Sequence, residues 1–129
     1  MNFPKPNTKS ILVVGDVILD GYYWCDVTRI SPEAPIPVCK LNKTSYVPGG
    51  AGNVARNIAS LGAKPVLIGL CGKDQTAALL KKTLEEAHIS SANMLESDAV
   101  KTTKKIRIIA QKQQMLRLDE ESNISLSQA

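Results

Sequence analysis

The chain has 129 residues, a net charge of +4 and a hydrophobic content of 43%, which is the composition of one ordinary globular domain. No apolar run reaches the roughly 18 residues needed to cross a bilayer, and residues 1–10 lack the apolar core of a signal peptide. We therefore expect a cytoplasmic protein without a membrane partner. The cysteines show no CxxC spacing and His88 is the single histidine, so we expect free thiols and neither a zinc site nor a histidine-based triad.

The first aliphatic run, "ILVVGDVILD" (Ile11–Asp20), is typical of a strand buried on both faces of a parallel sheet. Residues Pro65–Leu70 read as a second strand of this kind. Apolar residues at helical spacing predict helices at Gly52–Leu61, which Gly62 would end, and at residues 75–89. Strands that alternate with helices predict an α/β sheet with right-handed crossovers.

Two stretches interrupt that alternation. About thirty proline-rich residues precede the first helix, with short strand-like pieces at Val38–Leu41 and Ser45–Val47. Near the C-terminus, "TTKKIRIIA" and "QQMLRLD" alternate polar and apolar residues around the turn Gln111–Gln113, which predicts a hairpin with one face in water. Together these pieces, approximately residues 21–48 and 101–119, predict a small antiparallel β lid beside the main sheet.

The sequence beyond Asp119 is polar and ends soon afterwards. A parallel sheet of so few strands would leave apolar faces and edges uncovered. The chain is therefore interpreted as the N-terminal fragment of a larger domain.

Six lysines and arginines fall between Lys101 and Arg117. Such a cluster is a solvated strand face, a nucleic-acid patch or a phosphate-binding surface. No aromatic residue lies among these cations, so bases would have no stacking platform and a nucleic-acid partner is the weaker hypothesis.

The glycines of "PGGAGNVARNIASLGA" stand directly before the first predicted helix. They fit a tight strand-to-helix turn, and they equally fit a bare backbone that a ligand approaches at the unpaired N–H groups of the helix start.

From Gly49 to Gly72 the chain resembles the first signature of the ribokinase-like (PfkB) sugar kinases: a diglycine, a small residue, Asn53, Ala55 and two further spaced glycines. Segments such as "RISPEAPIPV" and "KKIRIIAQKQQMLRLD" are most similar to the kinase domain of bacterial heptose-7-phosphate kinases. This resemblance implies an α/β ribokinase-like fold with a lid through which two copies pair. It also implies ATP- and Mg2+-dependent phosphorylation of D-glycero-D-manno-heptose 7-phosphate at the anomeric hydroxyl, towards ADP-heptose for lipopolysaccharide, often with an adenylyltransferase domain fused.

The resemblance also assigns roles to individual residues. Asp20 matches the carboxylate that binds sugar hydroxyls, and Gly49, Gly50 and Asn53 match residues that line the sugar pocket, where a Cβ on either glycine would collide with the sugar. Asp16 is a weaker candidate, with a structural role as the alternative.

The predicted lid supplies the candidate contacts to the substrate's phosphate. Lys105 and Arg107 lie two apart on a predicted strand and so share a face, and arginine suits the paired oxygens of a phosphate. Arg29 and Arg117 are weaker candidates, and a merely solvated lid face is the alternative for all four.

One departure from the family limits what this chain does. The Gly-Ala-Gly-Asp motif that carries the family's catalytic aspartate does not occur here. We therefore expect no catalytic base in this chain, and ATP and Mg2+ mainly on a missing C-terminal half, so that the fragment alone is inactive. A non-catalytic sugar-phosphate-binding or dimerising module, another ribokinase-family sugar kinase and a basic nucleic-acid-binding domain are the alternatives.

Overall fold

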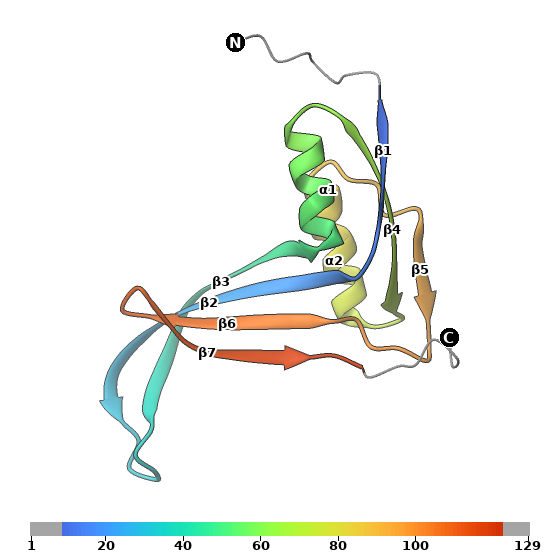
Figure 1. Ribbon diagram of the computed structural model, residues 1–129. Helices are drawn as coiled ribbons and strands as arrows, with labels where there is room; N and C mark the ends of the chain where they lie inside the picture. Colours follow the sequence, from blue (N-terminus) through green and yellow to red (C-terminus); the bar gives the residue numbers. More distant parts are fainter. Residues whose placement is uncertain (1–8, 123–129) are drawn as a thin grey trace, which may run out of the picture.

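The structure, a computed structural model, describes residues 9–122, which form two sheets and two helices (Figure 1). A parallel three-stranded sheet has the order β1-β4-β5, and a second sheet has the order β3-β2-β6-β7. The strands are β1 Ser10–Val14, β2 Val17–Ile30, β3 Pro37–Gly50, β4 Lys64–Gly72, β5 Met94–Ser97, β6 Lys104–Ala110 and β7 Gln113–Glu120. The helices are α1 Ala51–Ser60 and α2 Gln75–Glu86.

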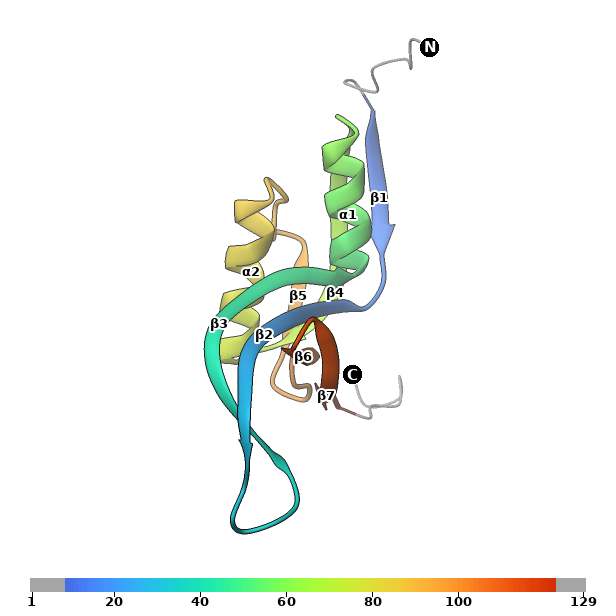
Figure 2. The ribbon, with the colours of Figure 1, turned by 90° about the vertical axis from the view of Figure 1, so that its left-hand side faces the viewer.

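Both helices cover the same face of the parallel sheet (Figures 1 and 2). The strand order β1-β4-β5 progresses in one direction, and right-handed crossovers between such strands place their helices on one side. The predicted helices and the strand at Pro65–Leu70 are confirmed. Strand β5 was not predicted, because a four-residue strand with one buried side chain gives no periodic signal.

The helix ends follow the predicted chemistry. Gly62 has a φ of 87°. Its N–H donates to the carbonyl oxygen of Ala59, and the N–H of Ala63 donates to the carbonyl oxygen of Ile58. This is the Schellman arrangement that ends helices at a left-handed residue. Helix α2 ends in the same way at His88, whose φ is 58°, although a glycine is the usual residue at this position.

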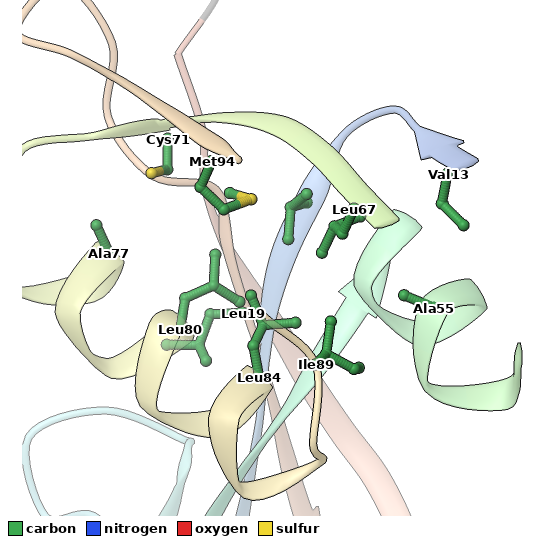
Figure 3. Packing of buried hydrophobic residues seen from close by; sticks show 11 residues of the cluster. Val13, Leu19, Ala55, Leu67, Cys71, Ala77, Leu80, Leu84, Ile89 and Met94 are labelled. Atoms are coloured by element: carbon green, nitrogen blue, oxygen red, sulfur yellow. The ribbon is translucent and has the colours of Figure 1, made fainter. Parts of the chain in front are cut away.

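The core lies between the helices and both sheets (Figure 3). Leu80 and Leu84 of α2 are fully buried against Leu67 of β4, and Leu19 of the second sheet joins them with no exposed surface. The two sheets thus share one core.

The opposite face of the parallel sheet is bare. Leu12 and Val14 of β1 are 61% and 67% exposed, and Leu95 of β5 is 61% exposed. The prediction that the first strand is buried on both faces is wrong for the described residues, because the helices of this chain reach one face alone.

The predicted strand Ile11–Asp20 is in fact two strands in different sheets. β1 ends at Val14, and β2 begins at Val17 beyond Gly15 and Asp16. The aliphatic pattern hides this break, because Val13 and Val17 point into the same core from either side of it. Asp20 therefore does not close the first strand, as predicted, but lies within β2.

The second sheet is mixed and not antiparallel as predicted. β2–β3 and β6–β7 are antiparallel hairpins, and β2 pairs with β6 in parallel. Residues 17–50 form two long strands in place of the short pieces expected, with the proline-containing segment 31–36 at the tip. The predicted hairpin around Gln111 is confirmed: Gln111 and Lys112 both have positive φ, as a type I′ turn requires.

Asp74 joins the start of α2 to the segment that leads into β6. Its carboxylate accepts the N–H of Ala77 at 2.7 Å, as an N-cap, and the N–H of Thr102 at 2.9 Å. Partial burial alone would raise the pKa of Asp74, but the N–H groups of Thr102 and Ala77 outweigh it and lower the pKa below its ordinary value.

Replacing Asp74 with Ala should lower the free energy of unfolding by about 1–2 kcal/mol at neutral pH, because one cap is lost. A lowered folded-state pKa means that this stabilisation is present above the unfolded pKa of about 3.9 and is lost as the pH falls through the folded value. Urea denaturation from pH 7 to pH 3 measures both effects. Asp98→Ala is the control, because its exposed ion pair with Lys73 should contribute less than about 0.5 kcal/mol. Equal losses in the two variants would contradict the cap.

Candidate functional site

Alternate side chains of β2 point to opposite sides of the second sheet. Val17 and Leu19 face the core, with 2% and 0% exposure, whereas Asp20 and Tyr22 face the other way and are half-buried. We call that other side the open face. The register of the sheet adds residues from the neighbouring strands to it: Val47 opposite Asp20 on β3, and Lys105 and Arg107 beside Asp20 and Tyr22 on β6.

The strongest contact on the open face joins two of the predicted site residues. Arg107 donates from Nη1 to Oδ1 of Asp20 at 2.7 Å, and the two side chains are 24% and 17% exposed. The Asp20 carboxylate raises the pKa of the Arg107 guanidinium above its ordinary value. A charge-assisted hydrogen bond in this partly sheltered position holds one oxygen of Asp20 and leaves the other for further donors.

Gly49 lies against that second oxygen. A Cβ built on Gly49 would stand 2.3 Å from Oδ2 of Asp20, which is closer than atoms approach without displacement. The glycine thus makes room for the chain's own carboxylate. The sequence predicted that the missing Cβ leaves space for a sugar. In the structure the same space is also needed by the Asp20 side chain.

Gly50 connects β3 directly to α1 with a φ of 55°. Its missing Cβ would lie 2.3 Å from the carbonyl oxygen of Asp16, the same oxygen that accepts the N–H of Ala51 at 2.8 Å. Asp16 therefore anchors the start of α1 through its backbone. This is the structural role that the sequence left as the alternative.

Two further predicted residues lie around this start of α1. Asn53 stands in the first turn, where its Oδ1 accepts Nη2 of Arg56 at 2.9 Å. Asp16 and Lys105 line one hollow of about 290 Å3 beside Ile18, and Glu121, which follows β7, lines it as well. The structure thus brings Asp16, Asp20 and Lys105 to the same end of the open face, next to the two glycines.

Lys105 and Arg117, two of the other predicted cations, are also ion-paired. Lys105 Nζ lies 3.7 Å from Oδ2 of Asp119 and 4.0 Å from Oε2 of Glu121. Arg117 donates to both carboxylate oxygens of Asp119, from Nε at 2.8 Å and from Nη2 at 2.9 Å. Arg117 stands directly opposite Arg107 in the β6–β7 register. Like charges opposite each other are unfavourable, and each arginine is offset by its own carboxylate.

Arg29 is not brought to this site. It lies nine residues beyond Asp20 on β2, about 30 Å along the strand at roughly 3.3 Å per residue. It sits near the tip of the β2–β3 hairpin, so within one copy of the chain the weaker prediction for Arg29 has no geometric support.

The open face also carries aromatic residues that were not predicted to belong to the site. The Arg107 guanidinium lies 5.3 Å from the ring centre of Tyr22, and Lys43 Nζ lies 5.2 Å from that of Trp24. The expectation that these cations have no stacking platform beside them is wrong for Arg107, because the neighbouring strand β2 supplies the ring of Tyr22. The signal in the sequence was the two-residue spacing of Asp20, Tyr22 and Trp24, which puts their side chains on one face of a strand. No strand was predicted beyond Asp20, so this shared face was not recognised.

Other kinds of site are not formed by the residues described. Among residues 9–122, no group of three or more His, Cys, Asp or Glu could hold a metal ion. Neither described helix is long and apolar enough to span a membrane. The three cysteines are free thiols, as predicted, and burial raises the pKa of Cys71.

Replacing Gly50 with Ala should lower the free energy of unfolding by about 2–3 kcal/mol, because the backbone conformation is nearly exclusive to glycine and the Cβ would meet the Asp16 carbonyl. Gly15→Ala is the matched control, since its Cβ would make an ordinary 3.5 Å contact with Ala51. Thermal or urea denaturation measures the difference. If Gly50→Ala proved as stable as Gly15→Ala, the assigned backbone constraint would be wrong.

Known proteins resemble the chain along nearly all of its length. The bifunctional protein HldE of Caulobacter vibrioides is 49% identical over 113 residues, which cover 88% of this chain and 23% of HldE. The HldE protein of Blochmanniella pennsylvanica is 47% identical over 117 residues, covering 91% of this chain and 24% of the relative. The chain therefore spans about a quarter of the length of these relatives.

Solved structures share the fold. A carbohydrate kinase from Agrobacterium tumefaciens superposes with a TM-score of 0.68 at 22% identity, covering 88% of this chain and 36% of the other. Arabidopsis thaliana ribokinase, solved with ribose and ATP, gives a TM-score of 0.61 at 16% identity, covering 86% and 35%. The model of the pfkB family carbohydrate kinases matches residues 8–128, nearly the whole sequence. The chain belongs to the pfkB family of carbohydrate kinases.

Proposed function

We propose that the chain is the N-terminal part of a kinase that transfers the γ-phosphoryl group of ATP to the anomeric hydroxyl of D-glycero-D-manno-heptose 7-phosphate, towards ADP-heptose for lipopolysaccharide. The observation that carries the proposal is the similarity to HldE proteins along nearly the whole chain. The segment "RISPEAPIPV", which spans the tip of the β2–β3 hairpin, supports it through its resemblance to the heptose-7-phosphate kinases.

In this proposal the open face provides the acceptor-sugar site. Asp20 accepts sugar hydroxyls through the oxygen that Arg107 leaves available, and an ionised carboxylate is the best acceptor for two donors in fixed geometry. Gly49 and Gly50 present backbone beside it, and Asn53 offers an amide from the first turn of α1. These groups bind and orient the sugar, and none of them acts as the general base.

The catalytic aspartate, ATP and Mg2+ belong in this proposal to residues beyond the chain. Phosphoryl transfer depends on a metal, a phosphate cradle and a base held together, and the Gly-Ala-Gly-Asp motif that carries the family's base does not occur in this sequence. The chain spans about a quarter of its HldE relatives, and the bare face of the parallel sheet carries exposed Leu12, Val14 and Leu95. We propose that the remainder of the kinase domain covers this face.

We further propose that two copies of the kinase pair through the second sheet. Its outer strand β7 is exposed along its whole length, including Met115, Leu116 and Leu118 at 48%, 52% and 46%. An exposed apolar edge of this kind is a pairing surface in soluble proteins.

The test is an ATP-turnover assay on the product of the complete gene, with heptose 7-phosphate and Mg2+, beside the same assay on the 129-residue chain. The longer protein should phosphorylate the sugar, and the short chain should not. Sugar binding without turnover by the complete product would favour the non-catalytic binding module. Turnover by the purified short chain would contradict the fragment assignment.

Lys105 is the proposed contact to the 7-phosphate, because it lines the hollow beside Asp16 and its ion pairs, at 3.7 and 4.0 Å, are looser than the 2.7 Å bond that holds Arg107 to Asp20. In the complete enzyme, Lys105→Ala should raise the KM for heptose 7-phosphate about ten-fold more than that for unphosphorylated heptose, as loss of a charged hydrogen bond predicts. Lys104→Ala is the matched control, because Lys104 pairs with Glu120 and neighbours Lys105 on the opposite face. Asp20→Asn should raise the KM for both sugars by the same factor. If Lys105→Ala raised the KM for both sugars by the same factor, Lys105 would not contact the phosphate.

A further inference from the structure

A continuous row of side chains crosses the open face from Asp20 to Lys43. Asp20 is bound to Arg107 at 2.7 Å, and Arg107 lies 5.3 Å over the ring of Tyr22. Tyr22 stacks on Trp24 with a centroid distance of 5.9 Å and an interplanar angle of 23°, and Lys43 lies 5.2 Å from the Trp24 ring. We call this row the side-chain ladder.

The sheet itself produces the ladder. Tyr22 is the register partner of Arg107 in the parallel β2–β6 pair, and Trp24 is the register partner of Lys43 in the antiparallel β2–β3 pair. Tyr22 and Trp24 are two residues apart on one strand, so their rings share a face. The contact between Asp20 and Arg107 is diagonal, because the register partner of Asp20 on β6 is Lys105, and long side chains span this diagonal.

The ladder restricts the side chain that holds Asp20. A free arginine samples many rotamers, and holding it in one conformation costs conformational entropy. An aromatic ring attracts a guanidinium and offers it one flat surface. Since Tyr22 contacts Arg107 and Trp24 supports Tyr22, the guanidinium is held in the direction of Asp20.

Asp20 is consequently held from two sides. Arg107 binds Oδ1, and the Cα of Gly49 lies against Oδ2, where a Cβ would come within 2.3 Å. A carboxylate held in this way has a fixed orientation before any ligand arrives, which reduces the cost of binding.

We propose that Tyr22, supported by Trp24, is a positioning residue that holds Arg107 against Asp20 and thereby sets the orientation in which Asp20 receives the sugar. The assignment of the sugar site rests on the proposed function. Tyr22 acts through Arg107 and does not touch the substrate.

Three substitutions in the complete enzyme test this role. Tyr22→Leu should raise the KM for the sugar about three- to five-fold, as the loss of an exposed cation–π contact predicts, without changing the KM for ATP. Tyr22→Phe keeps the ring and should behave as wild type. Tyr23→Leu is the matched control, because Tyr23 is the next residue of β2, lies on the opposite face and contacts Tyr46 with a hydroxyl distance of 2.8 Å.

A merely structural role would lower the melting temperature of Tyr22→Leu and of Tyr23→Leu by similar amounts, and the KM for the sugar would be unchanged in both variants. That result would overturn the proposal. So would a Tyr22→Phe enzyme as impaired as Tyr22→Leu, since the hydroxyl and not the ring would then matter.

A double-mutant cycle separates positioning from direct contact with the sugar. Arg107→Met removes the guanidinium, and Tyr22→Leu should have no further effect on the sugar KM in that background. A full three- to five-fold effect that persists without Arg107 would mean that Tyr22 touches the sugar itself, and the proposal would be wrong.

Trp24 provides a readout that needs no substrate, because it is the single tryptophan of the 129-residue chain. In that chain Tyr22→Leu and Arg107→Met should increase acrylamide quenching of the Trp24 fluorescence, whereas Tyr23→Leu should not. Unchanged quenching in both ladder variants would overturn the ladder whatever the enzyme's substrate. Altered quenching in an enzyme that binds no heptose phosphate would support the ladder and contradict the proposed function.

Discussion

The burial of Leu19 determines what the open face presents. This residue belongs to the second sheet, yet it is completely enclosed by the core that α2 and the parallel sheet build. Because side chains alternate along a strand, burying Leu19 inward forces Asp20 outward, and Tyr22 and Trp24 after it. A shift of one residue in β2 would bury the carboxylate and expose the leucine. The energy of the core thus fixes the orientation of a polar site that the core itself never touches.

The elements that could be predicted from the sequence are those whose signal is local. Helix α1 and its end at Gly62 follow from apolar spacing and from one glycine with positive φ. The hairpin at Gln111 follows from polar and apolar alternation on both sides of a short turn. The change of sheet at Gly15 could not be predicted, because Val13 and Val17 enter the same core and the aliphatic run continues across the break. The parallel pairing of β2 with β6 depends on how the elements between them are arranged in space, and the residue pattern of a strand does not encode that arrangement.

The candidate site was predictable only through resemblance. Nothing in the local sequence of Asp20 or Arg107 relates the two, and the structure brings them together from different strands. The resemblance selected these residues but not their contact with each other, and it treated Gly49 and Gly50 as space for a ligand. In the structure both glycines are also required by atoms of the chain, the Asp20 carboxylate and the Asp16 carbonyl. Tyr22 and Trp24 were missed because a long proline-rich stretch conceals a regular strand.

The bond between Asp20 and Arg107 closes a loop of 87 residues. Contacts of such long sequence separation form late, because the entropy of closing the loop must be overcome first. During synthesis at about 5–20 residues per second, Arg107 would be made roughly 4–17 s after Asp20. Until then the Asp20 carboxylate has no guanidinium beside it and β2 has no partner on its β6 side, with β3 as its other neighbour in the sheet. The order of synthesis thus separates the β2–β3 hairpin, which is complete early, from the site on its open face, which forms only after Arg107 has been made.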